Sequence, residues 1–351
     1  MSANNRSPIS ATEAATLFGG LVSSRGVLLA VSGGPDSTAL LWLAARWRKS
    51  SGVKLTAVTV DHGLRKEARK EAAAVARLAR ALRVSHRIVK WTGAKPATGI
   101  QQSARRARYA LLIAAAKKSG AEHIVTAHTL DDQAETVLMR MMRGSGIGGL
   151  AGMSRMTYFD GAVLVRPFLD VPKTRLVATC KTAKLAYAED PSNLDPKFTR
   201  ARLRPLMETL AAEGLDARRL STLARRLRRA DAAIDAQVDR LVAAWTDSET
   251  ATSVPAAAFA SLPAETALRL LGRAVARRGD EGPVELGKLE ALFAAILHAA
   301  QKAGKTPFRR TLAGALVTIA GGDIRVERAP ARRPQSLTKR RSGPEKRRKA
   351  R

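Results

Sequence analysis

The chain has 351 residues, of which 45% are hydrophobic, 61 are Lys or Arg and 30 are Asp or Glu. The hydrophobic content excludes a wholly disordered protein, and no apolar run approaches the roughly 18 residues that a membrane span needs. The single cysteine, Cys180, excludes an internal disulfide framework and any multi-cysteine metal or thiol-transfer site. The length allows two domains, each with its own core.

The formal net charge is +31, and residues 331–351 contribute +9 of it through ten basic side chains and one acidic one. We expect this tail to be disordered. The remaining +22 favours a polyanionic partner, with RNA a better candidate than a membrane, although an Arg-rich genome is the alternative source of the charge. Residues 1–10 show no basic-then-apolar signal pattern, so we expect a cytoplasmic protein without a membrane partner.

In chain order, a short amphipathic helix is predicted at 11–24, and the most informative stretch follows it. Residues 27–31 form an apolar run typical of a strand buried on both faces. Ser-Gly-Gly-Pro-Asp-Ser at 32–37 is a tight turn, and an apolar helix begins near Ala39. A strand, a glycine turn and a helix start make an anion site, because the first-turn N–H groups have no partner inside the helix.

The residue types in this turn suit a phosphate and a metal ion. Gly33 and Gly34 can take positive φ and place no Cβ between backbone and phosphate. Asp36 would repel a phosphate unless a cation lies between them, and Mg²⁺ held by this carboxylate and by phosphate oxygens resolves the conflict. The turn is neither a Walker A loop nor a G-x-G-x-x-G motif. A capped glycine turn without a ligand is the alternative.

Strands and helices alternate in the following part of the chain. Further buried strands are predicted at 55–60, 86–91 and 122–127, and helices at 67–83, 101–119 and 131–143. This order predicts an α/β fold, a parallel sheet with helices on both faces, whose ligands bind beyond the carboxyl ends of the strands. The turn at 32–37, Asp61-His62 and residues 128–132 all follow strands, so we expect them to converge on one crevice.

The C-terminal half is predicted to be mostly helical. The elements expected there are an irregular glycine-rich segment at 144–153, a hairpin ending at 165, helices at 172–184, 198–213 and 215–245, a linker at 246–255, helical structure at 256–303, and two strands within 311–327. The domains expected are an N-terminal segment (1–25), a catalytic α/β domain (26–215), a helical connector and linker (216–254), a small α+β C-terminal domain (255–330) and the basic tail (331–351).

The segment 127–136, Ala-His-Thr-Leu-Asp-Asp-Gln-Ala-Glu-Thr, is dense in groups that can take part in chemistry. Asp132 and Glu135 are three residues apart on a predicted helix and therefore share a face, which makes a suitable cradle for an ammonium group. The alternative is that Asp131 or Asp132 only caps the helix. His128 is a candidate base, and a hydrogen-bonded structural His is the alternative.

The turn at 32–37 resembles the pyrophosphate-binding loop of the N-type ATP pyrophosphatase, or PP-loop, superfamily, whose members cleave ATP between the α and β phosphates. Over roughly residues 26–215 the likeness is to the members that form lysidine in tRNA, and it is fainter over 256–328. It is carried by Val-Asp-His-Gly-Leu-Arg (60–65), Ala-Arg-Arg-Ala-Arg-Tyr (104–109), the 127–136 segment, Arg-Gly-Ser-Gly-Ile-Gly-Gly-Leu (143–150), Arg-Pro-Phe-Leu (166–169) and Asp-Pro-Ser-Asn (190–193).

The resemblance implies an ATP-dependent ligase with ATP as co-substrate and Mg²⁺ as cofactor. ATP adenylates O2 of the wobble cytidine, C34, of a CAU-anticodon tRNA(Ile) and releases pyrophosphate. Free L-lysine then displaces AMP at C2 to give lysidine, which changes codon reading from AUG to AUA. Because the free amine has a pKa of about 10.4, a base must take its proton. The family's short forms allow a homodimer, and residues 255–330 resemble its small tRNA-binding domain.

The resemblance also implies roles for individual residues. Asp36 and His128 are the expected catalytic residues, with Asp36 also the metal ligand, and Asp132 and Glu135 are the expected lysine-binding pair. Arg105, Arg108 and Arg200 are expected to contact tRNA or phosphate; alternatively, Arg108 or Arg200 pairs with the carboxylates. The expected ATP-binding residues are Ser32, Gly33, Gly34, Pro35, Asp36, Ser37, Asp61 and His62.

Other functions fit the sequence less well. Thiolating members of the superfamily need cysteines to carry sulfur or an iron–sulfur cluster, and Cys180 alone does not suffice. Amide-forming members usually rely on a glutaminase, of which the sequence shows no sign. A nucleotide-regulated RNA-binding protein without catalysis is the alternative from a different class. It fits the charge but leaves Asp36, Asp132 and Glu135 without a role.

Overall fold

The structure, a computed structural model, describes residues 6–61, 63, 68–93, 100–188, 197, 199–243, 245–248, 250–301 and 308–330. The chain forms two compact units, Met1–Asp231 and Ala232–Arg351, and each is described by itself. Within the described ranges, no helix combines the length and the apolar character that crossing a membrane requires.

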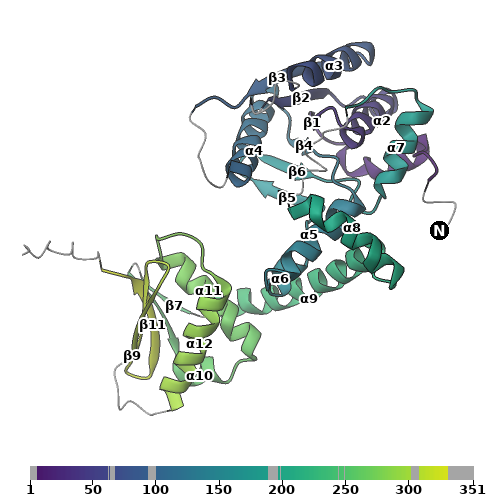
Figure 1. Cartoon of the computed structure of the whole chain (residues 1–351). Helices are drawn as coiled ribbons and strands as arrows, with labels where there is room; N and C mark the ends of the chain where they lie inside the picture. Colours follow the sequence, from purple (N-terminus) through teal and green to yellow (C-terminus); the bar gives the residue numbers. More distant parts are fainter. Residues whose placement is uncertain are drawn as a thin grey trace, which may run out of the picture. The chain divides into compact units, whose positions relative to one another are not determined.

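The first unit is built on a six-stranded sheet with the order β3-β2-β1-β4-β6-β5 (Figure 1). The strands are β1 (Val27–Ala30), β2 (Leu55–Asp61), β3 (Ser85–Lys90), β4 (His123–Val125), β5 (Met156–Phe159) and β6 (Ala162–Val165). All neighbouring strands pair in parallel except β5, which forms an antiparallel hairpin with β6 at the sheet edge. The predicted parallel sheet is therefore confirmed.

Helices cover both faces of this sheet. The helices of this part of the chain are α1 (Ala11–Leu17) with the 3₁₀ turn η2 (Gly19–Leu21), α2 (Pro35–Ser51), α3 (Ala68–Ala81), α4 (Ile100–Ser119), α5 (Leu130–Met141), α6 (Ile147–Leu150), α7 (Lys173–Thr182), α8 (Thr199–Ala212) and α9 (Ala217–Ala243), which continues into the second unit. Leu28 of β1 packs in one cluster with Leu112 of α4, whereas its neighbours Val27 and Leu29 belong to the cluster formed with α2, α3 and α7. Successive side chains of a strand point to opposite faces, so both faces carry a core.

The second unit is a five-stranded antiparallel sheet with the order β7-β8-β11-β10-β9, accompanied by helices. The elements are β7 (Thr246–Asp247), β8 (Ala251–Pro255), α10 (Ala256–Ala260), α11 (Ala264–Arg278), α12 (Leu286–Gln301), β9 (Phe308–Leu312), β10 (Ala315–Ala320) and β11 (Asp323–Arg328). Its core joins Val238 of α9 with Leu271 of α11, Ile296 of α12 and Val317 of β10. This agrees with the predicted α+β class.

Two local predictions were wrong. The proposed linker at 246–255 contains β7 and β8, because Thr252 is fully buried and donates a hydrogen bond to Asp247, which pairs with Arg278. The glycine-rich 144–153 segment contains the short helix α6. The two strands predicted within 311–327 are confirmed as β10 and β11, and β9 comes before them.

The five-part domain division stays a prediction, and the boundary between the compact units falls within α9 after Asp231. The tail at 331–351 lies outside the described residues.

Candidate active site

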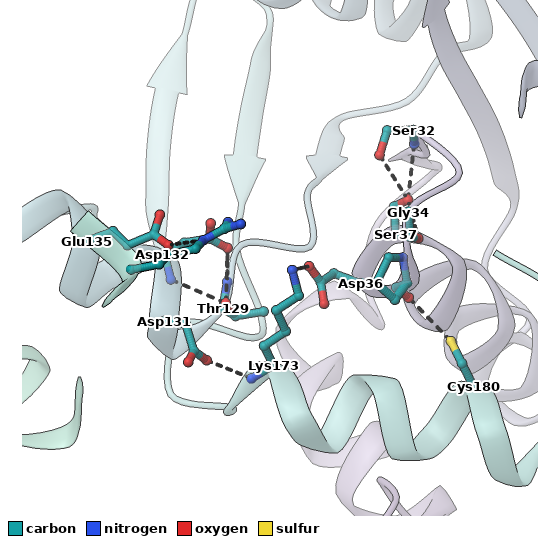
Figure 2. Close-up of polar contacts among 12 residues, drawn as sticks. Ser32, Gly34, Asp36, Ser37, Thr129, Asp131, Asp132, Glu135, Lys173 and Cys180 are labelled. Atoms are coloured by element: carbon teal, nitrogen blue, oxygen red, sulfur yellow. Dashed lines mark hydrogen bonds and ion pairs between the residues drawn. The ribbon is translucent and has the colours of Figure 1, made fainter. Parts of the chain in front are cut away.

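The turn after β1 is organised by the hydroxyl of Ser37 (Figure 2). Ser37 Oγ accepts hydrogen bonds from the N–H groups of Ser32 and Gly33, both at 3.1 Å, and donates to the carbonyl of Gly34 at 3.1 Å. Gly33 has a φ of +93°, a backbone conformation that residues with a side chain rarely adopt. Gly34 is the N-cap residue of α2, and no side chain caps it. The first-turn N–H groups of α2 are thus left for an anion.

Asp36 stands in the first turn of α2, with a charge that its surroundings disfavour. Burial raises the pKa of Asp36 to about 6; Lys173 opposes this shift, and the charges of Asp132 and Asp131 add to it. Asp36 Oδ2 lies 3.6 Å from Lys173 Nζ (Figure 2). Asp36 Oδ1 is buried and has no hydrogen-bond partner.

These contacts bear on the predicted magnesium site. The described residues contain no group of three or more His, Cys, Asp or Glu side chains that could hold a metal ion. An orphaned carboxylate oxygen beside a phosphate-binding helix start nevertheless suits Mg²⁺, which is often bound by one or two carboxylates and substrate phosphates. The residues present therefore fit a metal held by Asp36 and ATP together.

The acidic residues at the start of α5 both have partners within the fold (Figure 2). Thr129 and Asp132 form a capping box: Thr129 Oγ1 accepts from the N–H of Asp132 at 3.3 Å, and Asp132 Oδ2 accepts from the N–H of Thr129 at 2.9 Å. Asp131 Oδ2 accepts from the N–H of Lys173 at 2.7 Å, which joins the start of α5 to the start of α7. Asp132 therefore caps α5, as one of the two interpretations of the sequence predicted, and only its second oxygen, Oδ1, lies outside the capping box.

Glu135 is 5% exposed and lies between two arginines of α8. Its Oε1 accepts from Arg204 Nε at 3.0 Å, and its Oε2 lies 3.6 Å from Arg200 Nε. Oε2 is buried and accepts no hydrogen bond. The structure therefore places Arg200 against a carboxylate, which is the alternative to its expected contact with tRNA or phosphate.

His128 follows β4, and its Nδ1 lies 2.8 Å from Thr126 Oγ1. Burial lowers the pKa of His128 to about 4; Asp132 opposes this shift, and the positive charges of Arg166, Arg105 and Arg200 add to it. The imidazole is therefore neutral at pH 7. Arg105 itself is exposed on α4, with its guanidinium 5.2 Å from the ring centre of Tyr109, and Arg108 is exposed one turn further on.

The remaining predicted ATP-binding residues are only partly described. Asp61 ends β2, next to β1, and its Oδ1 accepts from the N–H of Gly63 at 2.8 Å. His62 lies outside the described residues. A cavity of about 350 Å³ between α1, α2 and α7, lined by residues including Trp42 and Trp47, contains none of the predicted site residues.

Sequence reasoning missed Lys173 and Arg204. A lysine at the first position of a helix is a usable signal, because the helix dipole disfavours a cation there. The spacing of Arg200 and Arg204 is another, since residues four apart share one face of a helix. Neither signal reveals the partner, because Asp36 and Glu135 are remote in the sequence.

Comparison with known proteins first defines the class of domain to which the first part of the chain belongs. A model of the PP-loop domain matches residues 7–210. The fold is similar to that of the U34-tRNA thiolase NcsA from Methanococcus maripaludis, with a TM-score of 0.54 and 16% identity over 62% of this chain and 77% of that chain. These matches, with the Ser-Gly-Gly-Pro-Asp-Ser turn at the start of α2, define a PP-loop ATP-binding domain.

Closer relatives narrow the class. The tRNA(Ile)-lysidine synthase of Bradyrhizobium diazoefficiens is 53% identical over 95% of this chain and 98% of its own length. That of Rhodopseudomonas palustris is 54% identical over 95% of this chain and 99% of its own. The chain therefore belongs to the tRNA(Ile)-lysidine synthase family, and the prediction of an ATP-dependent ligase is confirmed.

Proposed function

We propose that the protein joins free lysine to C2 of the wobble cytidine C34 in a CAU-anticodon tRNA(Ile), using ATP and forming lysidine. Besides the family, the proposal rests on one observation. Lys173 contacts Asp36 through its side chain and Asp131 through its backbone, so the phosphate-binding turn and the carboxylate-rich start of α5 lie side by side (Figure 2). A site that activates one substrate with ATP and then admits an amine needs both features together.

The reaction has two steps. Cytidine O2 attacks the α-phosphorus of ATP; the O2–P bond forms, the bond to the β-phosphate breaks, and pyrophosphate leaves. The lysine amine then attacks C2, and AMP leaves with O2. Backbone N–H groups of the turn would hold the phosphates, and Asp36 would hold Mg²⁺ together with ATP, which when bound would offset the phosphate charge. The product changes the codon read from AUG to AUA.

Asp132 and Glu135 are the proposed lysine site. Glu135 Oε2 is a buried acceptor without a hydrogen bond, and Asp132 has one oxygen, Oδ1, outside its capping box. An ammonium group has three donors and no acceptor, so it requires such oxygens. Arg204 and Arg200 then hold Glu135 in position through their contacts with its two oxygens.

His128 is the proposed proton acceptor. It is neutral at pH 7, as a base must be, but a pKa near 4 makes it a weak one for an amine. The negative charge of bound ATP would raise that pKa.

The tRNA is proposed to contact Arg105 and Arg108 as well as the second unit. Both arginines are exposed on α4, and the charges of Arg105 and Arg200 act on His128 and Arg108 respectively. A homodimer and a cytoplasmic location stay predictions.

Mass analysis of nucleosides tests the proposal directly. After incubation with CAU-anticodon tRNA(Ile), ATP and lysine, we expect a cytidine that has gained one lysine and lost water. Repeated release of pyrophosphate should depend on both tRNA and lysine, because without lysine the reaction stops at the adenylated tRNA. A non-catalytic RNA-binding protein, the second candidate favoured by the net charge of +31, would bind the tRNA without either product.

A further inference from the structure

Lys173 is a cation at the PP-loop to which the sequence analysis gave no role. Its backbone N–H donates to Asp131 Oδ2 at 2.7 Å, and the preceding Val171 carbonyl accepts from the N–H of Leu130 at 3.0 Å. Both contacts tie backbone groups around the start of α7 to the start of α5, one through the Asp131 side chain and one through the Leu130 backbone. They fix where the Lys173 side chain begins and leave its ammonium group for another partner.

That ammonium group points at Asp36 but is held loosely (Figure 2). The distance from Nζ to Asp36 Oδ2 is 3.6 Å, whereas charge-assisted N–H···O bonds are typically about 2.7–2.9 Å long. The Lys173 side chain is 38% exposed, so it has room to turn. On the other side of the pair, Asp36 Oδ1 is buried without a hydrogen-bond partner. Neither charge is fully satisfied by the other.

We propose that Lys173 is a catalytic residue that binds the pyrophosphate portion of ATP. The inference rests on the proposed adenylation at this turn. A phosphate at the first turn of α2 lies beside Asp36, and Lys173 Nζ is already within 3.6 Å of that carboxylate. As the bond between the α-phosphorus and the bridging oxygen breaks, negative charge builds up on pyrophosphate. The ammonium group stabilises that charge and so favours the leaving group.

A purely structural role makes a different prediction. If Lys173 only offsets the charge of Asp36, its loss disturbs the turn and weakens every ligand that contacts it. If Lys173 binds pyrophosphate, its loss weakens ATP and spares AMP, which lacks the β- and γ-phosphates. AMP and ATP share the base, the ribose and the α-phosphate. Comparing their affinities therefore isolates the contact between Lys173 and the β- and γ-phosphates.

The test is equilibrium binding of ATP and of AMP to the full chain carrying Lys173→Met. We expect about a 10- to 100-fold rise in the Kd for ATP, the usual effect of losing a hydrogen bond to a charged group, and no change for AMP. Lys173→Arg should recover part of the ATP affinity. The matched control is Lys181→Met, which removes an exposed positive charge from the same helix and should change neither constant. Lys173→Gln replaces the Met variant if its melting curve shows misfolding.

A double variant separates the two roles further. In an Asp36→Asn background there is no charge for Lys173 to offset, so a persisting loss of ATP affinity on Lys173→Met supports the phosphate contact. A loss that disappears in that background, while the Asp36→Asn protein still binds ATP, overturns the inference. Unchanged ATP affinity in the single variant, or equal weakening of ATP and AMP, overturns it as well. If the wild-type protein itself binds no ATP, the proposed function fails together with the inference.

Discussion

Asp36 is the single charge on which adenylation is expected to depend most. Asp36→Asn keeps the shape of the side chain but removes the charge that would hold Mg²⁺. We expect pyrophosphate release to fall at least about 100-fold, in the range seen when one electrostatic interaction with a transition state is removed. The melting temperature should change little. Near-normal pyrophosphate release from this variant would exclude the metal role.

Asp132 and Glu135 are predicted to set the lysine requirement. Asp132→Asn and Glu135→Gln should each raise the lysine concentration needed for half-maximal rate by on the order of 30-fold or more, because a charged partner is left uncompensated. ATP and tRNA affinities should change little, and saturating lysine should recover part of the rate. Glu208→Gln, an exposed acid on α8, is the control. Unchanged lysine dependence with weakened ATP binding would assign both carboxylates to the nucleotide site.

His128 gives a prediction about pH. Its pKa of about 4 in the folded protein lies below the 6.5 expected in the unfolded chain. The unfolded chain therefore binds more protons between these values, and stability present above pH 6.5 is lost as pH falls towards 4, by up to about 3 kcal/mol.

Denaturant unfolding at pH 7 and at pH 4.5 measures this effect. His128→Asn should lose less stability over the range than the wild type, because Asn does not titrate. His298→Asn, which changes an exposed histidine of α12, should behave like the wild type. Equal acid sensitivity of the wild type and His128→Asn would show that His128 is not the group responsible.

At the scale of elements, the helices and strands that could be predicted from the sequence are those marked by hydrophobic periodicity or by a short motif. The β1 turn and α2 were predictable because an apolar run, two glycines and a helical run follow one another within a few residues. The strand β8 was missed because Ala251, Thr252 and Ser253 lack the β-branched apolar pattern of a strand. Thr252 is buried only because its hydroxyl finds Asp247 and Arg278, and both contacts depend on the folded second unit.

In the candidate site, too, the local motifs could be predicted and the long-range contacts could not. The residues at 32–37 and 128–135 were recognisable because each group lies within one turn or one helix start. Their charge partners were not. Lys173 reaches Asp36 and Arg204 reaches Glu135 across long stretches of chain, and only tertiary packing decides such pairs.

At the scale of the whole molecule, the basic tail is predicted to add affinity for RNA without reading it. Removing residues 331–351 takes away ten positive charges. For each RNA phosphate that the shortened protein no longer neutralises, the slope of log affinity against log salt should fall by about one, so tRNA binding should become less dependent on salt. Filter binding across a salt series measures the slope. Discrimination between tRNA(Ile) and tRNA(Met) should survive; if it disappears while affinity holds, the tail is a specificity element.

Cys180 of α7 is fully buried, and its Sγ lies 3.3 Å from the carbonyl oxygen of Pro35, the first residue of α2. Burial and the charge of Asp36 raise the pKa of this thiol to about 11, so almost no thiolate, the reactive form, exists at neutral pH. A thiol reagent can therefore reach Cys180 only during moments when α7 lifts away from α2. The chain has one cysteine, so every modified molecule marks one such opening. The rate of thiol modification therefore reports how often α7 separates from α2 and from the phosphate-binding turn.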